Sequence, residues 1–105
     1  MSVKLVISTT ANKDEAQNIA RQVVEEKLAA CVNILPGIQS IYRWEDNIQN
    51  DSEYLLLIKT TANAISHLKK KIIQLHSYSV PEIIVLDITE GSNEYLNWVG
   101  QNVKY

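Results

Sequence analysis

Residues 30–60 decide the fold, and they read ACVNILPGIQSIYRWEDNIQNDSEYLLLIKT. From Ala30 to Trp44 this stretch is rich in Val, Ile, Tyr and Trp in partial alternation, which predicts a strand. Pro36 and Gly37 interrupt the alternation, and proline or glycine inside a strand commonly marks a bulge or a bend. We therefore expect one long, bent strand.

The second half of this stretch turns the chain back on itself. Residues 45–47, Glu-Asp-Asn, are turn formers. After a polar stretch, the apolar run from Tyr54 to Thr60 predicts a second strand, so the two strands form a long hairpin. A hairpin folded near Asp46 brings Lys59 close to Cys31.

Upstream of the hairpin, a strand precedes a helix. The run from Val3 to Thr9 is apolar and β-branched, which is typical of a buried strand. Asn12 and Glu15 have the three-residue spacing of a capping box at a helix start. Apolar residues then recur at helical spacing and predict a helix with one stripe on the sheet: Ala16, Ile19, Ala20, Val23, Val24 and Leu28.

Downstream of the hairpin, the pattern runs helix, strand, helix. The second helix is predicted from Asn63 onward by the helical spacing of four apolar residues, Ile65, Leu68, Ile72 and Leu75. The apolar run from Ile83 to Thr89 predicts a fourth strand. Gly91 and Ser92 introduce a short last helix, on which three residues share a face: Tyr95, Trp98 and Val99.

This order of elements predicts an α+β fold, the ferredoxin-like split β-α-β sandwich with a long central hairpin and a short C-terminal helix. One domain covers residues 1–105, because the chain has neither a linker nor an internal repeat. Both long helices cover one face of the sheet. The other face and the hairpin edges stay exposed in a monomer, so we expect the chain to associate with itself.

The composition excludes several classes of function. The formal net charge is -2, which gives no general attraction to nucleic acid or to an anionic membrane. No signal peptide or membrane-spanning run is recognisable, and the single Cys31 cannot form an intramolecular disulfide, so we expect a cytoplasmic protein. The isolated glycines form neither a P-loop nor a dinucleotide fingerprint, and no nucleophile elbow is present. We therefore expect no enzyme.

Several separated strings of the sequence closely resemble the CutA divalent-cation tolerance family, and they cover essentially the whole chain. Each string falls where the pattern above places a strand, a helix or a turn. The strings are EKLAACVN at residues 26–33, PG at 36–37, SIYRWE at 40–45, IKTT at 58–61, HSY at 76–78, VPEII at 80–84 and YLNW at 95–98.

This resemblance implies a homotrimer built by pairing the hairpins around a three-fold axis. It also implies a role in divalent-cation tolerance, with copper or another divalent cation as the bound ion. The trimeric PII regulators are similar in fold and symmetry. An alternative function is therefore a PII-like structural or signalling trimer that acts through a protein partner without binding metal.

The metal ligands that the resemblance implies are incomplete in this chain. Bacterial members are ascribed a cysteine at the end of the first strand and two adjacent histidines. This chain has Ser8 and Leu75 at two of these positions and keeps His76. Since copper prefers imidazole and sulfur donors, a site here would combine His76 with Glu82, Cys31 or a side chain of a neighbouring subunit.

The predicted site is a cleft between subunits. The expected metal ligand is His76, and the residues expected to bind a cofactor or small ligand are Cys31, Lys59, Tyr78 and Glu82. Simpler interpretations stay open: Cys31 as a small buried hydrophobe, and Lys59 in an ion pair with Glu82. Four aromatic side chains are expected to fill a core or a subunit interface rather than stack on bases: Tyr42, Trp44, Tyr95 and Trp98.

Overall fold

The computed structural model describes residues 2–105 and contains one four-stranded sheet, three α-helices and a short 3₁₀ helix, η1. The expected single domain begins at Met1, which lies outside the described residues. In chain order the elements are β1 (Val3–Thr10), α1 (Lys13–Glu25), β2 (Cys31–Trp44), β3 (Asn47–Thr61), η1 (Ala62–Ala64), α2 (Ile65–Leu75), β4 (Ile84–Asp87) and α3 (Asn93–Gln101).

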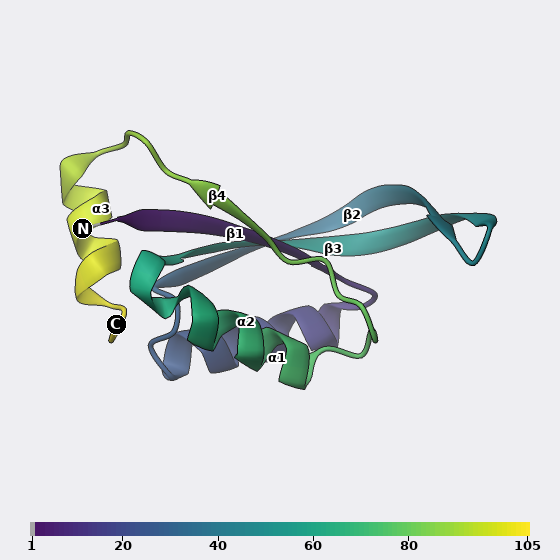
Figure 1. The fold of residues 1–105 in the computed structure, drawn as a ribbon, viewed down its shortest axis with the longest axis horizontal. Helices are drawn as coiled ribbons and strands as arrows, with labels where there is room; N and C mark the ends of the chain where they lie inside the picture. Colours follow the sequence, from purple (N-terminus) through teal and green to yellow (C-terminus); the bar gives the residue numbers. More distant parts are fainter. Residues whose placement is uncertain (1) are drawn as a thin grey trace.

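The sheet has the topology that the sequence predicts. Its strand order is β2-β3-β1-β4, and every neighbouring pair is antiparallel. Helices α1 and α2 lie side by side on one face, while α3 sits at one end of the sheet (Figure 1). This arrangement confirms the ferredoxin-like α+β fold with a long central hairpin.

Local signals in the sequence set the ends of α1. The side chain of Asn12 accepts a hydrogen bond from the Glu15 backbone N–H at 2.8 Å, which caps the first turn. The helix ends at Glu25, because Lys27 adopts a left-handed backbone with φ of 57°. The Leu28 N–H then bonds the Val23 carbonyl at 2.9 Å, as in a Schellman motif.

The central hairpin is longer than the pattern predicts. Strand β3 begins at Asn47 rather than at Tyr54, because residues 47–53 pair with β2 all the way to the tip. Backbone pairing orders these polar residues, and their side chains carry no apolar alternation that would reveal a strand. The expected bend is present as a shift in register between Leu35 and Ile38, where Gly37 has φ of +72°.

The fourth strand is shorter than predicted. Strand β4 spans Ile84–Asp87 instead of Ile83 to Thr89, and it pairs only with residues 4–7 of β1. It lies at an edge of the sheet, where one side of the strand has no neighbour among the described residues. All four of its residues are exposed. An edge strand of this kind is available for pairing with another chain.

Most of the apolar core lies between the sheet and the two long helices. It is built from residues of β1, β3, α1 and α2 that are buried, among them Val6, Ile19, Leu56, Ile58, Leu68 and Ile72. A second, smaller core packs α3 against the end of the sheet through Val3, Ala30, Ala64, Val99 and Val103. These two cores fix the positions of the strands that carry the candidate site.

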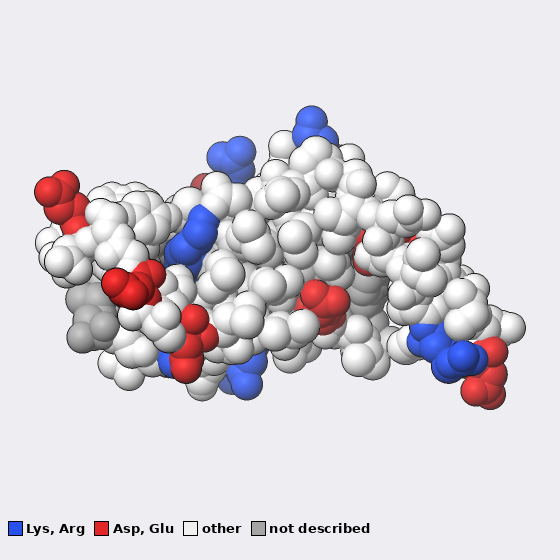
Figure 2. Space-filling model, turned by 90° about the horizontal axis from the view of Figure 1, so that it is seen from above, with Lys and Arg blue, Asp and Glu red and all other residues white. Residues whose placement is uncertain are grey.

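The face of the sheet opposite α1 and α2 is apolar and largely open. Directly paired residues point to the same face, so the register places Leu5, Ile7, Leu57, Ile84 and Leu86 on it together. Figure 2 shows the molecule from this side, with few charged side chains over the middle of the face. Ile84 and Leu86 are 49% and 42% exposed. Apolar surface of this kind is typical of an association surface.

Candidate functional site

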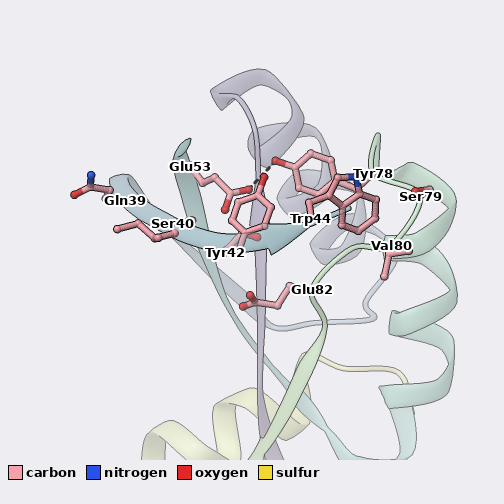
Figure 3. A pocket seen from close by; sticks show the side chains of 11 residues that line it. Gln39, Ser40, Tyr42, Trp44, Glu53, Tyr78, Ser79, Val80 and Glu82 are labelled. Carbon is pink, nitrogen blue, oxygen red and sulfur yellow. Dashed lines mark hydrogen bonds between the residues drawn. The ribbon is translucent and has the colours of Figure 1, made fainter. Parts of the chain in front are cut away.

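A cavity of about 710 Å³ lies between the distal half of the hairpin and the segment that follows α2. Its volume falls in the range of small-molecule sites. Figure 3 shows the side chains that surround it, and no lysine or arginine is among them. The lining residues are Thr9, Gln39, Ser40, Ile41, Tyr42, Trp44, Glu53, Tyr78, Ser79, Val80 and Glu82.

A buried carboxylate joins the two walls of this cavity. Glu53 on β3 is only 5% exposed, and its Oε2 accepts a hydrogen bond from the Tyr78 hydroxyl at 2.6 Å. The pKa of Tyr78 is raised well above its ordinary value, mainly by burial and also by the hydrogen bond to Glu53. Tyr78 therefore stays protonated at neutral pH and acts as a hydrogen-bond donor.

A second phenol and carboxylate pair stands on the hairpin beside the first. The Tyr42 hydroxyl donates to the carboxylate of Asp51 on the paired strand. This hydrogen bond raises the pKa of Tyr42, with further contributions from the charges of Asp51 and Glu53. Together with the exposed Glu82, the two pairs place three carboxylates on this side of the molecule.

His76 lies behind the cavity wall and is held by protein atoms at both ring nitrogens. It follows α2 as its C-cap and is 9% exposed. Its Nδ1 accepts the backbone N–H of Tyr78 at 3.0 Å, so Nε2 carries the proton and donates to the Thr9 carbonyl at 2.7 Å. A histidine bonded in this way positions Tyr78 and has no free lone pair for a metal.

Glu15 supports the same segment from α1. Its Oε2 accepts the Ser77 backbone N–H at 2.8 Å, and its Oε1 is buried without a hydrogen-bond partner among the described residues, 4.0 Å from Nδ1 of His76. The sequence pattern predicted a role for Glu15 only in the capping box of α1. It also did not single out Glu53, whose only sequence signal is a lone acid at the start of an apolar strand.

Two of the predicted site residues lie elsewhere on the open face of the sheet. Cys31 and Lys59 are direct partners across β2 and β3, and Lys59 Nζ lies 3.9 Å from Cys31 Sγ while it donates to Asn33. Tyr95 on α3 lies beside this pair. Its pKa is raised mainly by partial burial and also by the neighbouring Cys31 thiol. The expected ion pair between Lys59 and Glu82 is absent among the described residues.

The structure therefore divides the predicted site into two groups. Tyr78 and Glu82 line the cavity with His76 behind them, whereas Cys31 and Lys59 form a separate cluster near α3. The four aromatic residues do not fill a core within one chain, because they are 39% to 47% exposed, and their place in a subunit interface stays a prediction. These are Tyr42, Trp44, Tyr95 and Trp98.

The described residues of this chain do not fit a tight copper site. Among residues 2–105, no three His, Cys, Asp or Glu side chains converge well enough to hold a metal ion. Ser8 is fully buried on the face of β1 that packs against the helices, and Leu75 packs against the same core. His76 is occupied as well, so the described residues do not bring together the imidazole and sulfur donors that copper prefers.

Comparison with known proteins gives one consistent family. The family model for the CutA1 divalent ion tolerance protein matches residues 4–102. The divalent-cation tolerance protein CutA of Thermus thermophilus is 50% identical over 99 residues, which cover 94% of this chain and 96% of that protein. The chloroplastic CutA protein of Arabidopsis thaliana is 45% identical over 100 residues, which cover 95% of this chain but 55% of that protein.

The solved structures give the same result. The structure of the divalent cation tolerance protein from Thermus thermophilus matches with a TM-score of 0.94 at 48% identity. That match covers 96% of this chain and 98% of the other. Within residues 2–105, no helix combines the length and the hydrophobicity needed to cross a bilayer.

Proposed function

This chain belongs to the CutA1 divalent ion tolerance family, and on that premise we propose that it is a cytoplasmic homotrimer of copper and divalent-cation homeostasis. In this proposal it binds or senses a metal ion or a small ligand in a cleft between subunits. It acts by binding rather than by catalysis. The observation that carries the proposal is the cavity lined by Tyr78 and Glu82 next to an uncovered apolar face.

Two features of the subunit support the trimer: an apolar face of the sheet and unpaired strand edges, both of which are exposed to water in a monomer. Strands β2 and β4 are the two edges of the sheet, and the open face between them carries paired apolar side chains such as Leu5 with Leu86. Closing three sheets around an axis buries such a face and pairs such edges. The same closure brings Cys31 and Lys59 near a neighbouring subunit.

A metal in this proposal takes its donors from more than one subunit. Glu82 is exposed, and Cys31 is partly exposed on the open face, so both are accessible to an adjacent subunit. His76 takes part only if it releases the Tyr78 N–H that now occupies Nδ1. We therefore expect a weak site rather than a tight one within the subunit.

Two measurements test this proposal. Light scattering at micromolar concentration is expected to give three times the 11.9 kDa of the chain, and a monomer mass would exclude the cleft. Calorimetry with Cu²⁺ and Zn²⁺ is expected to show binding that His76→Gln weakens and His67→Gln leaves unchanged. His67 is a fair control because it lies on α2 but stacks on Tyr105, away from the cavity. Absence of any metal binding would remove the metal from the proposal.

A second function is favoured by the tip of the hairpin. Ile41, Trp44 and Ile48 are 66%, 47% and 62% exposed there, which is unusual for residues of these types. A PII-like trimer would present this tip to a protein partner. A partner retained after chelation, but lost when the loop from Glu45 to Asp51 is altered, would support this alternative over a metal-dependent role.

A further inference from the structure

The cavity between the hairpin and residues 78–82 has aromatic walls and carboxylates but no cationic lining residue. Tyr42, Trp44 and Tyr78 provide the aromatic side chains, and Figure 3 shows them gathered on one side of the cavity. Glu53 on β3 and Glu82 in the segment before β4 provide the negative charge. Aromatic faces and carboxylates are the two groups that bind organic cations in proteins.

Glu53 is the better placed of the two carboxylates. It is 5% exposed, and its single side-chain hydrogen bond uses Oε2, so Oε1 has no partner among the described residues. Burial strengthens the attraction between a carboxylate and a cation, because less water screens the charge. Glu82, which is exposed, contributes a second carboxylate at the cavity rim.

The lining favours an organic cation over a metal ion. Calcium and magnesium need about six oxygen ligands at short range. The described residues offer no group of three His, Cys, Asp or Glu side chains that could surround one ion. An ammonium group needs only one or two carboxylates, and its alkyl part gains contact with the aromatic side chains of Tyr42 and Trp44.

We propose that this cavity binds a small primary alkylammonium ion, with its charged end at Glu53 and Glu82 and its apolar part against Tyr42, Trp44 and Tyr78. This inference rests on the proposed ligand-binding function of the cleft and names the class of ligand. The proposal requires that the cavity stays open to the ligand in the assembled protein.

The test is a fluorescence titration in a Trp98→Phe background, which leaves Trp44 as the only tryptophan. The probe is n-butylammonium chloride, the neutral comparison is n-butanol, and potassium chloride keeps the ionic strength constant. We expect saturable binding of n-butylammonium and binding of n-butanol at least about tenfold weaker, which corresponds to about 1.4 kcal/mol. Equal affinities for the two compounds would overturn the proposal. So would the absence of binding by either compound, which is the result expected if a neighbouring subunit fills the cavity.

Variants locate the binding. Glu82→Gln removes an exposed carboxylate of the rim and is expected to weaken n-butylammonium about tenfold. Glu53→Gln should weaken it further. Glu82→Gln keeps the test valid if Glu53→Gln fails to fold. Glu90→Gln, at an exposed acid outside the cavity, is the matched control and should leave the affinity unchanged. An equal loss in the control would show general charge attraction and refute the site.

A copper titration of the same preparation separates this inference from the broader proposal. Copper binding without n-butylammonium binding would refute the alkylammonium site and leave the cation-homeostasis proposal standing. Binding of n-butylammonium without copper would support the site and remove the metal from the broader proposal. Failure of both ligands would refute the alkylammonium site and remove the metal from the broader proposal.

Discussion

Replacing Ser8 by alanine is expected to make the protein more stable. Ser8 is 0% exposed, and its hydroxyl has no hydrogen-bond partner among the described residues, although Oγ is buried on the helix-facing side of β1. A buried hydroxyl without a partner costs about 1–3 kcal/mol relative to its hydration in the unfolded chain. Ser8→Ala removes that cost and leaves a gap of a single oxygen atom. We expect a net gain of about 1 kcal/mol in the free energy of unfolding.

The assay is urea unfolding, monitored by tryptophan fluorescence at one fixed protein concentration, because the stability of the proposed oligomer would depend on concentration. Thr60→Val is the matched control. Thr60 is also 0% exposed, but its hydroxyl donates to the Leu28 carbonyl at 2.7 Å. Removing that bond should lower the free energy of unfolding by about 1 kcal/mol. The two variants should therefore shift stability in opposite directions.

The opposite result for Ser8→Ala would refute the reasoning. A loss of more than about 0.5 kcal/mol would mean that the Ser8 hydroxyl has a partner, such as an ordered water. Ser8→Cys extends the test to function, because the family resemblance places a ligand cysteine at this position. A thiol there faces the apolar core, so we expect higher stability, slow reaction with thiol reagents and no gain in copper affinity.

Three further predictions concern the cavity wall, the open face and a helix end. Tyr78→Phe leaves Glu53 buried without its donor and should lower the free energy of unfolding by about 1.5–3 kcal/mol in urea melts at pH 8. Because the folded pKa of Tyr78 is raised above the ordinary value of 10.0, the wild type should lose stability as pH rises above about 10, and the variant should lose less over the same range. A steeper decline in the variant would contradict this assignment. If the proposed trimer forms, Leu57→Asp on the open face should convert it to smaller species in light scattering, whereas Ile73→Asp, at a residue 57% exposed on α2, should not. Asn12→Ala should cost about 1 kcal/mol in thermal melts, since it removes the cap of α1, and an unchanged midpoint would show that the cap contributes nothing.

Local sequence determined the order and type of the elements. The spacing of Ile19, Val23 and similar residues gives α1 one apolar stripe, and Asn12 marks its start, because both signals act within a few residues of the chain. The alternation from Ala30 to Trp44 likewise predicted the first arm of the hairpin. The family followed from strings spread over the chain, and the family model covers residues 4–102.

The set of residues that line the cavity could not be predicted from local sequence, because it depends on contacts between residues far apart in the chain. Tyr78 meets Glu53 across 25 positions, and His76 meets Thr9 across 67. Neither hydrogen bond leaves a trace in local spacing, so the sequence shows Glu53 only as an acid at the start of an apolar strand. For the same reason Cys31 and Lys59, although correctly paired from the hairpin, could not be separated from Tyr78 and Glu82 before the strands were placed.

Sequence by itself thus determined the ferredoxin-like topology, the hairpin and the family, because periodicity, capping and turn chemistry are properties of neighbouring residues. Only the tertiary structure decided what the retained His76 does. Both of its ring nitrogens bond to backbone groups, one on β1 and one on the loop after α2. A histidine becomes a ligand or a structural anchor according to the groups that the fold brings to its nitrogens, and those groups come from distant segments.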